Sequence, residues 1–272
     1  MIPVFDHGFL YGDSIYETFR TVEGYPLQLS GHIDRLFRSA RPLELKIPLT
    51  KHKIASEILK TIKTYWKKHT KEDLYIRVIV TRGVGDIGFD PELCPRPSWM
   101  IIAKKFVPAP EKLYKTGIKI SLVSTIRNHP KSIDPKIKSG NYLNNLLAYL
   151  EARRHHASDA VMPNIDGYIT EATTNSVFLV KKGVLLTPSL DSGILESLTR
   201  ELIIEIAKKN HISVREKKIT KAEFLAADEC FLAGSLKGIL PVTQCDLKKI
   251  GKGRVGPITQ KLLHLLNHAI LS

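Results

Sequence analysis

The sequence lacks the segments that would anchor a chain in a membrane or export it. No run of apolar residues among its 272 is long enough to cross a bilayer. The first seven residues, MIPVFDH, lack the basic segment followed by an apolar run that a secretory signal requires. With 43% hydrophobic and 25% charged residues, the composition is that of an ordinary soluble globular protein. We therefore expect a cytoplasmic protein without a membrane partner.

Cysteine is scarce, and the common motifs of metal and nucleotide chemistry are absent. Cys94, Cys230 and Cys245 are an odd number with no C-x-x-C spacing, which argues against a disulfide framework and against a structural zinc site. His155 and His156 are adjacent, so on a helix they point in different directions, and no H-E-x-x-H is present. The sequence also has no G-x-S-x-G elbow and no G-x-x-x-x-G-K-[ST] loop. We expect no metal site, and the simplest signals of serine hydrolases and nucleotide hydrolases are excluded.

Acidic residues are too few to balance the basic ones. The chain has 41 Lys and Arg against 27 Asp and Glu, which gives a formal net charge of +14 at pH 7. A basic face of this kind can bind phosphate if the charges cluster. The densest run of lysines, in residues 60–71, falls on the polar face of an amphipathic helix, where solvated lysines are expected. No nucleic-acid-binding motif accompanies the charge, so we expect no nucleic-acid partner.

The length admits two domains, and the composition indicates where they meet. Residues 51–68 carry apolar side chains at helical spacing, and residues 74–80 read as a buried strand that follows this helix. Residues 104–112 contain two prolines and mixed charge, as is typical of a connector. We predict a smaller N-terminal α/β domain at residues 1–105, a linker at residues 106–116 and a larger C-terminal domain at residues 117–272.

The second part of the chain alternates short strands and helices, without an internal repeat. In residues 139–155, Leu143, Leu146, Leu147 and Leu150 fall on one helical face. We predict strands at 118–125, 159–163, 168–170, 177–180, 184–187, 213–217 and 229–233, and helices at 139–155, at 195–209, from 221 and from 257. This layout predicts the α+β class.

Four segments in a fixed order carry a family resemblance. They are residues 5–13 (FDHGFLYGD), 31–36 (GHIDRL), 138–144 (KSGNYLN) and 169–175 (ITEATTN). The pattern resembles the fold-type IV pyridoxal-phosphate enzymes, which include branched-chain aminotransferases, D-amino-acid aminotransferases and aminodeoxychorismate lyases. The resemblance runs through nearly the whole chain. It implies a two-domain fold joined by a short linker, pyridoxal 5'-phosphate in the cleft between the domains, and a homodimer.

The resemblance assigns chemistry to two ionisable residues. It implies that Lys138 binds the cofactor covalently and moves a proton between the substrate α-carbon and the cofactor. Such a lysine must reach its neutral amine readily, which a desolvated or cation-adjacent position favours. Glu171 matches the carboxylate that keeps the pyridine nitrogen protonated, and this charge makes the cofactor an electron sink. Asn175 is expected to support the same end of the cofactor.

The phosphate end is expected to be held by side-chain and backbone donors. Arg35 matches the family arginine that binds the phosphate through its planar fork. Leu198 and Thr199 would present unpaired backbone N–H groups at the start of a helix. The resemblance also assigns Ser235 to the cofactor, and it places Tyr142 near the phenolic oxygen.

Substrate contacts are expected along one strand and one turn. Tyr75 and Arg77 are two residues apart, so on a strand they share a face, and this Tyr-x-Arg resembles the substrate strand of branched-chain aminotransferases. The remaining expected substrate contacts are Arg20, Tyr11, Leu236 and Lys237.

Two departures weaken the likeness to the branched-chain group. Thr18 stands where those enzymes usually carry glycine, and Ser-Leu-Lys-Gly at residues 235–238 replaces their usual turn. A lysine at position 237 would pair with a second carboxylate on the substrate, or it would point into solvent. The sequence also lacks the strand that commonly precedes residues 5–13 in relatives, which leaves a truncated start or a smaller first sheet.

The resemblance implies a transaminase that moves an amino group between a small amino acid and a 2-oxo acid. The alternative within the family is a 4-amino-4-deoxychorismate lyase, which releases pyruvate and 4-aminobenzoate. A third alternative is a basic binding protein that kept the fold and lost the chemistry, and the presence of Lys138, Glu171 and Arg35 argues against it.

Overall fold

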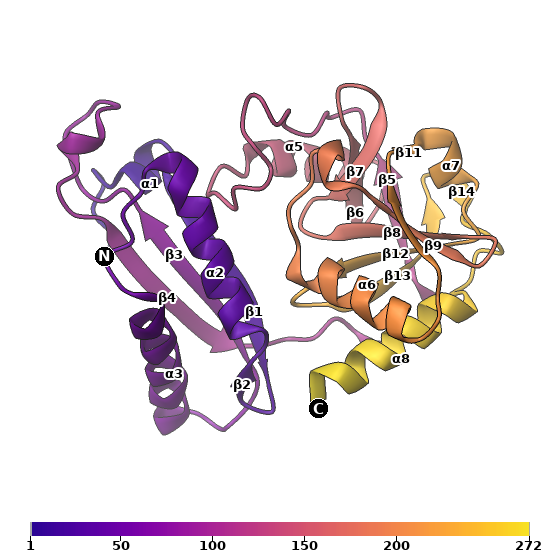
Figure 1. The fold of residues 1–272 in the computed structure, drawn as a ribbon, viewed down its shortest axis with the longest axis horizontal. Coiled ribbons are helices and arrows are strands. Elements are labelled where there is room, and N and C mark those ends of the chain that lie inside the picture. The colour runs from indigo at the N-terminus through magenta and orange to yellow at the C-terminus, as the bar shows by residue number, and fades with distance from the viewer. Residues whose placement is uncertain (1, 272) are drawn as a thin grey trace. The chain divides into compact units, whose positions relative to one another are not determined.

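The computed structural model describes residues 2–271 and forms two compact units. The first unit comprises Met1–Val107 and Ile137–Tyr142, and the second comprises Pro108–Lys136 and Leu143–Ser272. Each unit combines a β-sheet with helices, which confirms the predicted α+β class (Figure 1). Within residues 2–271, no helix has both the length and the apolar character needed to span a membrane.

A four-stranded antiparallel sheet is the centre of the first unit. Its order is β2-β1-β3-β4, with β1 at Ser14–Val22, β2 at Tyr25–Pro26, β3 at Leu74–Thr81 and β4 at Ser98–Lys105. Along β3, Leu74, Ile76 and Val78 are buried, and they alternate with the half-buried Tyr75 and Arg77. Tyr75 and Arg77 therefore share a face, as their spacing predicted.

Helices cover the apolar face of this sheet (Figure 1). They are α2 at Leu29–Ala40 and α3 at Lys51–Lys68; the short helices of the unit are α1 at His7–Leu10, η1 at Arg41–Leu43 and η2 at Pro91–Leu93. Helix α3 has the bounds that the sequence predicted. Its first turn is capped by the Thr50 hydroxyl, which accepts a hydrogen bond from the Lys53 N–H at 3.2 Å. Its buried face consists of Ile54, Ile58 and Ile62, one residue per turn.

A ten-stranded sheet organises the second unit. Its strands are β5 Ile118–Leu122, β6 Asp159–Pro163, β7 Tyr168–Ala172, β8 Ser176–Lys181, β9 Val184–Pro188, β10 Val214–Lys217, β11 Ile219–Thr220, β12 Glu229–Gly234, β13 Gly238–Cys245 and β14 Lys248–Lys249. The order is β10-β9-β8-β12-β13-β5-β6-β7-β11, and β14 pairs with β13. Strands β8 and β9 lie at the strands predicted for residues 177–180 and 184–187, and they pair as an antiparallel hairpin.

The helices of the second unit pack on the two faces of this sheet. They are α4 Glu111–Thr116, α5 Leu143–Arg154, α6 Leu198–Lys209, α7 Lys221–Leu225 and α8 Pro257–Leu271, with a 3-10 turn, η3, at Leu190–Ser192. Helices α6 and α8 cover one face, against Phe178 and Phe231, whose rings stack 4.9 Å apart. Phe224 of α7 packs with the other face, together with Leu113 and Tyr114 of α4.

The structure differs from the expected domain boundaries at two places. Residues 137–142, which the sequence placed in the second domain, belong to the first unit, because they hydrogen-bond to β1. Helix α5 therefore begins at Leu143 rather than at residue 139. The predicted linker contains α4, which packs against the core of the second unit.

The apolar face expected on α5 is exposed rather than buried. Leu143, Leu146, Leu147 and Leu150 are each about half exposed or more, from 48% to 67%. The buried residues of the helix are Asn145, Ala148 and Ala152. Small side chains on the inner face let α5 lie close to β6, so the leucines are left on the outside.

Stability should depend on the buried stripe of α3. Replacing Ile58, which is fully buried, by alanine leaves a cavity and should lower the free energy of unfolding by about 2–5 kcal/mol. Leu59→Ala, on the exposed side of the same helix, is the matched control and should cost less than about 1 kcal/mol. Urea unfolding of both variants measures the difference; equal losses would contradict this packing.

Candidate active site

Backbone hydrogen bonds hold the segment that contains Lys138 against the edge of β1. The Tyr16 N–H donates to the Lys138 carbonyl oxygen at 3.0 Å, and the Gly140 N–H donates to the Ser14 carbonyl oxygen at 2.8 Å. The Lys138 N–H in turn donates to the Ser39 hydroxyl on α2 at 3.1 Å. The lysine is thus presented from a fixed backbone, as a covalent catalytic residue requires.

The ring of Tyr16 gathers several predicted residues. The Lys138 amine lies 4.7 Å from the ring centroid, and the Arg77 guanidinium lies 4.0 Å from it. The Tyr142 ring meets the Tyr16 ring at 5.6 Å, and the two hydroxyls are hydrogen-bonded. Burial raises the pKa of Tyr16 well above its usual range, so this phenol stays protonated. The structure therefore brings Lys138, Tyr142 and Arg77 together around a residue that the sequence analysis did not single out.

Unpartnered polar atoms occupy the sheet face around Arg77. Thr18 lies directly opposite Arg77 in the β1–β3 register, and Arg20 lies opposite Tyr75. The Thr18 hydroxyl and the Nε atoms of Arg20 and Arg77 are buried without a hydrogen-bond partner. Buried donors of this kind are costly unless something bonds to them, so this face is suited to a ligand that accepts hydrogen bonds.

Arg35 lies on the buried side of α2, in a charged pair with Glu17 of β1. Its Nε and Nη2 donate to the two carboxylate oxygens of Glu17 at 2.7 and 2.8 Å. Glu17 has a second partner in His32, whose Nδ1 lies 2.6 Å from the same carboxylate. Burial alone would raise the pKa of Glu17, but the hydrogen bonds from Arg35 and His32 lower it to about 2. The guanidinium is therefore held in one plane by a carboxylate that is ionised at neutral pH.

Glu171 of β7 is held in the second unit by an arginine and a backbone group. Its Oε1 accepts from Arg127 Nε at 3.0 Å, and its Oε2 accepts from the Leu195 N–H at 3.1 Å. Arg127 Nη2 lies 2.9 Å from Oε1 as well, so the guanidinium contacts the carboxylate through two nitrogens. Both charged side chains are buried, with exposed fractions of 7% for Glu171 and 9% for Arg127. Glu171 is thus presented as a fixed, charge-paired carboxylate, which suits its predicted role.

The start of α6 lies beside the turn after β12. The helix begins at Leu198 because the Ser197 hydroxyl caps it, so Leu198 and Thr199 occupy the first two helical positions. The Thr199 hydroxyl lies 3.2 Å from the Ser235 hydroxyl. These three predicted cofactor residues are brought together in the second unit, and they form a cluster suited to an anion.

The rest of the turn after β12 is more open. Leu236 is half-buried and Lys237 is exposed. The Lys237 carbonyl oxygen accepts a hydrogen bond from the Tyr114 hydroxyl at 3.0 Å. The turn is therefore tied through its backbone, and the lysine side chain reaches solvent.

Two predicted residues are held by local contacts. The Asn175 amide donates to Asp159 Oδ2 at 3.1 Å, in a turn that also holds Thr173. The Tyr11 ring lies between His7 and Phe89, at 5.0 and 5.1 Å, and its hydroxyl accepts from the Gly88 N–H. Each contact fixes the side chain, and none of them by itself indicates a ligand.

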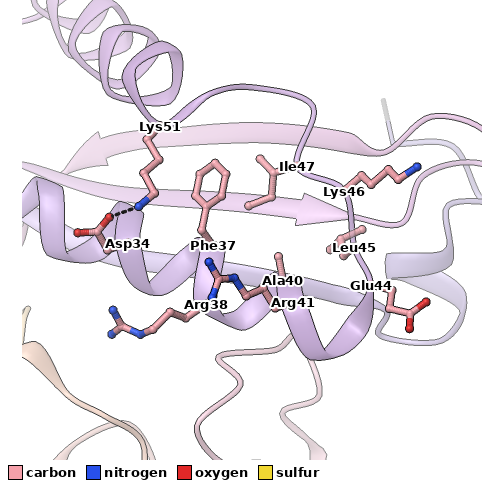
Figure 2. A pocket seen from close by; sticks show the side chains of 10 residues that line it. All are labelled: Asp34, Phe37, Arg38, Ala40, Arg41, Glu44, Leu45, Lys46, Ile47 and Lys51. Atoms are coloured by element: carbon pink, nitrogen blue, oxygen red, sulfur yellow. Dashed lines mark hydrogen bonds and ion pairs between the residues drawn. The ribbon is translucent and has the colours of Figure 1, made fainter.

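A hollow of about 590 Å³ beside α2 contains none of the predicted site residues (Figure 2). It is lined by Asp34, Phe37, Arg38, Ala40, Arg41, Glu44, Leu45, Lys46, Ile47 and Lys51. Lys51 pairs there with Asp34 at 2.6 Å. Asp34 lines this hollow whereas the next residue, Arg35, is buried, so the two charged neighbours on α2 have separate surroundings.

Comparisons with known proteins give the family. A sequence model of the family "Amino-transferase class IV" matches residues 14–245. The chain is a class IV aminotransferase. A Methanocaldococcus jannaschii protein named "Putative branched-chain-amino-acid aminotransferase" is 40% identical to it over 261 residues, which cover 96% of this chain and 88% of the relative. The aminodeoxychorismate lyase of Bacillus subtilis is 33% identical over 246 residues, covering 90% and 82%.

Solved structures support the same assignment. The branched-chain amino acid aminotransferase of Escherichia coli matches this aminotransferase with a TM-score of 0.92 at 29% identity, over 99% of this chain and 90% of that one. A branched-chain amino acid aminotransferase of T.th., determined with pyridoxamine 5'-phosphate, matches with a TM-score of 0.91 at 28% identity, over 99% and 89%. Class IV aminotransferases use pyridoxal 5'-phosphate.

Each unit of this aminotransferase contains residues whose chemistry suits pyridoxal phosphate. The first unit offers an amine on a fixed backbone at Lys138 and a positioned guanidinium at Arg35. The second unit offers an oriented carboxylate at Glu171 and a helix start at Leu198 and Thr199. The aldehyde of the cofactor needs an amine, and its pyridine nitrogen needs a carboxylate. Its phosphate needs hydrogen-bond donors that bind an anion.

Four residues with roles in this arrangement were missed by sequence reasoning. They are Tyr16, Glu17, His32 and Arg127. Glu17 carried a usable signal, because it lies two residues from Ile15 and two from Phe19 and so shares their buried face of β1. Arg127 follows β5 in a loop, where no periodic pattern marks it.

The Glu17–Arg35 ion pair should make the free energy of unfolding depend on pH in the acid range. Since the pKa of Glu17 falls from its ordinary value of 4.5 to about 2 on folding, the stabilisation is complete above pH 4.5 and is lost as the pH falls towards 2. Urea unfolding of the apoprotein should show a loss on the order of 3 kcal/mol over this range that is missing from Glu17→Gln. Glu205→Gln, at an exposed carboxylate, should follow the wild type. Parallel curves for wild type and Glu17→Gln would contradict the assigned pKa.

Proposed function

We propose that the protein works in the cytoplasm as a homodimeric, pyridoxal-phosphate-dependent amino-acid transaminase that moves an amino group between a small amino acid and a 2-oxo acid. The observation that carries the proposal is the arrangement around Tyr16. The Lys138 amine and the Arg77 guanidinium lie on one ring, 4.7 and 4.0 Å from its centroid. A group that moves protons and a group that binds a substrate anion are thus on the same sheet face.

The residues divide the work as follows. Pyridoxal phosphate, when bound, supplies an electron sink for the bonds to the substrate α-carbon. Lys138 holds the cofactor covalently and then moves the proton at the α-carbon. Glu171 keeps a proton on the pyridine nitrogen, and Arg127 orients Glu171 for that contact.

The remaining cofactor residues bind and orient. Arg35, the backbone N–H groups of Leu198 and Thr199, and the Ser235 hydroxyl bind the phosphate. Tyr142, linked to Tyr16, donates towards the phenolic oxygen. Asn175 supports the turn that follows Glu171.

The substrate is proposed to carry a second carboxylate. The guanidinium groups of Arg20 and Arg77 lie on the face that holds Tyr75, and their Nε atoms lack partners there. A carboxylate is the acceptor that best suits such forks. Tyr11, Leu236 and Lys237 are proposed to complete the substrate contacts. A dicarboxylic amino acid such as glutamate, with 2-oxoglutarate as its oxo acid, satisfies this chemistry.

Aminodeoxychorismate lyase activity is the second candidate. The 33% identity to the Bacillus subtilis lyase and Thr18, in a position where branched-chain enzymes usually have glycine, favour it. Purified protein given a panel of L- and D-amino acids, and separately aminodeoxychorismate, separates the two. A transaminase forms keto acid only when 2-oxoglutarate is added, whereas a lyase releases pyruvate without it. Absence of product in every arm would overturn both.

The homodimer rests on the exposed leucines of α5. Leu143, Leu146, Leu147 and Leu150 present an apolar stripe that nothing in the described part of the second unit covers. A second copy that covers this stripe in a twofold pair would bury it. Sedimentation should show a dimer for the wild type and a weaker dimer for Leu146→Ser/Leu147→Ser. A wild-type monomer that is active at the assay concentration would contradict this assembly.

Glu171→Gln should separate binding from catalysis. The amide keeps the size of the side chain but cannot hold a proton on the pyridine nitrogen by charge. We expect the cofactor to remain bound while kcat falls at least about a hundredfold, measured by absorbance titration and by turnover. Asp166→Asn, at an exposed carboxylate of the same unit, is the control and should keep the wild-type activity. Wild-type turnover in Glu171→Gln would show that another group sets the charge of the ring.

Lys237→Ala tests the substrate class. A charge-assisted contact with a second carboxylate contributes on the order of 1.5–3 kcal/mol, so kcat/KM for glutamate should fall roughly ten- to a hundredfold. The kcat/KM for leucine should stay nearly the same. Lys252→Ala, at another exposed lysine of the second unit, is the control. An equal change for both substrates, or none, would show that Lys237 does not contribute to the selectivity, which would then rest on Tyr75, Arg77 and Arg20 alone.

A further inference from the structure

Two buried ionisable groups of the first unit have no part in the proposed reaction. Glu17 is 1% exposed and His32 is fully buried, and both contact Arg35 or its partner. Glu17 lies on β1 between Ile15 and Phe19, whose side chains belong to the core of this unit, so an apolar residue would be expected in its place. Burying a carboxylate there is costly unless donors surround it, so its presence in the core calls for a physical reason.

The donors around Glu17 leave its partner very little freedom. Arg35 Nε and Nη2 reach one carboxylate oxygen each, at 2.7 and 2.8 Å, so the guanidinium and the carboxylate share a plane. His32 Nδ1 lies 2.6 Å from the oxygen that Nη2 contacts. Burial lowers the pKa of His32, so the neutral ring donates from Nδ1 and fixes the carboxylate in turn. A long arginine side chain is thereby held in one conformation.

We propose that Glu17, supported by His32, is a positioning residue that holds the Arg35 guanidinium in the orientation in which it binds the cofactor's phosphate. The proposal rests on the proposed function, because it takes Arg35 as a phosphate ligand. Fixing the fork before the anion arrives removes the conformational entropy that a free arginine would lose on binding.

The sign of the effect separates positioning from simple electrostatics. A carboxylate close to a phosphate repels it, so neutralising Glu17 would strengthen phosphate binding if charge alone mattered. Positioning predicts the opposite, because Arg35 loses its fixed orientation when the fork is weakened. The effect should also be confined to ligands that carry the anion, since Glu17 reaches the cofactor only through Arg35.

The test compares binding of pyridoxal phosphate and of pyridoxal to the apoprotein. We expect Glu17→Gln to weaken pyridoxal phosphate roughly ten- to a hundredfold while pyridoxal changes less than about threefold. The inhibition constant of inorganic phosphate against reconstitution should rise by a similar factor, which gives a readout even where pyridoxal binds too weakly to titrate. His32→Phe, matched in ring character, should move the same ratios by a smaller factor in the same direction.

Glu17→Gln/Arg35→Gln removes both buried charges and keeps hydrogen-bonding groups, so it remains a usable variant if Glu17→Gln alone does not fold. Its preference for pyridoxal phosphate over pyridoxal should be smaller than that of the wild type but not zero, because Leu198, Thr199 and Ser235 still bind the phosphate. Unchanged ratios in Glu17→Gln or His32→Phe, tighter phosphate binding, or equal weakening of both ligands would overturn the proposal. A wild-type protein that binds neither ligand at Lys138 would instead refute the proposed function itself.

Discussion

The candidate site depends on the backbone hydrogen bonds that hold residues 137–142 against the edge of β1. Two backbone hydrogen bonds, from Tyr16 to Lys138 and from Gly140 to Ser14, fix this segment on the first unit. Gly140 allows the close approach without displacing Ser14, because a Cβ at this position would lie 2.1 Å from the Ser14 hydroxyl oxygen. The segment therefore sets where the Lys138 amine lies, and the Tyr16 ring next to it collects Arg77 and Tyr142.

Strand β1 uses its two faces for different purposes. On the face covered by helices, Glu17 holds Arg35 within the apolar core. On the opposite face, Tyr16 and Thr18 lie beside Arg77 of β3. Because side chains alternate along a strand, one short segment can fix both the proposed phosphate-binding arginine and the proposed substrate face. The second unit also contains a buried arginine–carboxylate ion pair, formed by Arg127 and Glu171.

Features with local signals could be predicted from the sequence, and those with distant partners could not. Helix α3 has its predicted bounds because its cap and the spacing of its isoleucines lie within the segment itself. The docking of residues 137–142 on β1 depends on a partner more than a hundred residues away, so periodicity placed the start of α5 too early. In the candidate site, family motifs indicated Lys138, Glu171 and Arg35, and the structure gives each of them defined hydrogen-bond partners. Glu17 and Arg127, which contact Arg35 and Glu171, have no motif of their own, because their proposed function is to orient these partners.

The proposed reaction requires that Lys138 carries the cofactor. Borohydride reduction of the protein incubated with pyridoxal phosphate, followed by peptide mass spectrometry, tests it directly, because reduction makes the bond to the lysine permanent. We expect a yellow protein with one stoichiometric phosphopyridoxyl group on the peptide that contains Lys138, and no such group in Lys138→Ala. A stoichiometric adduct on a different lysine, or none at all, would contradict it.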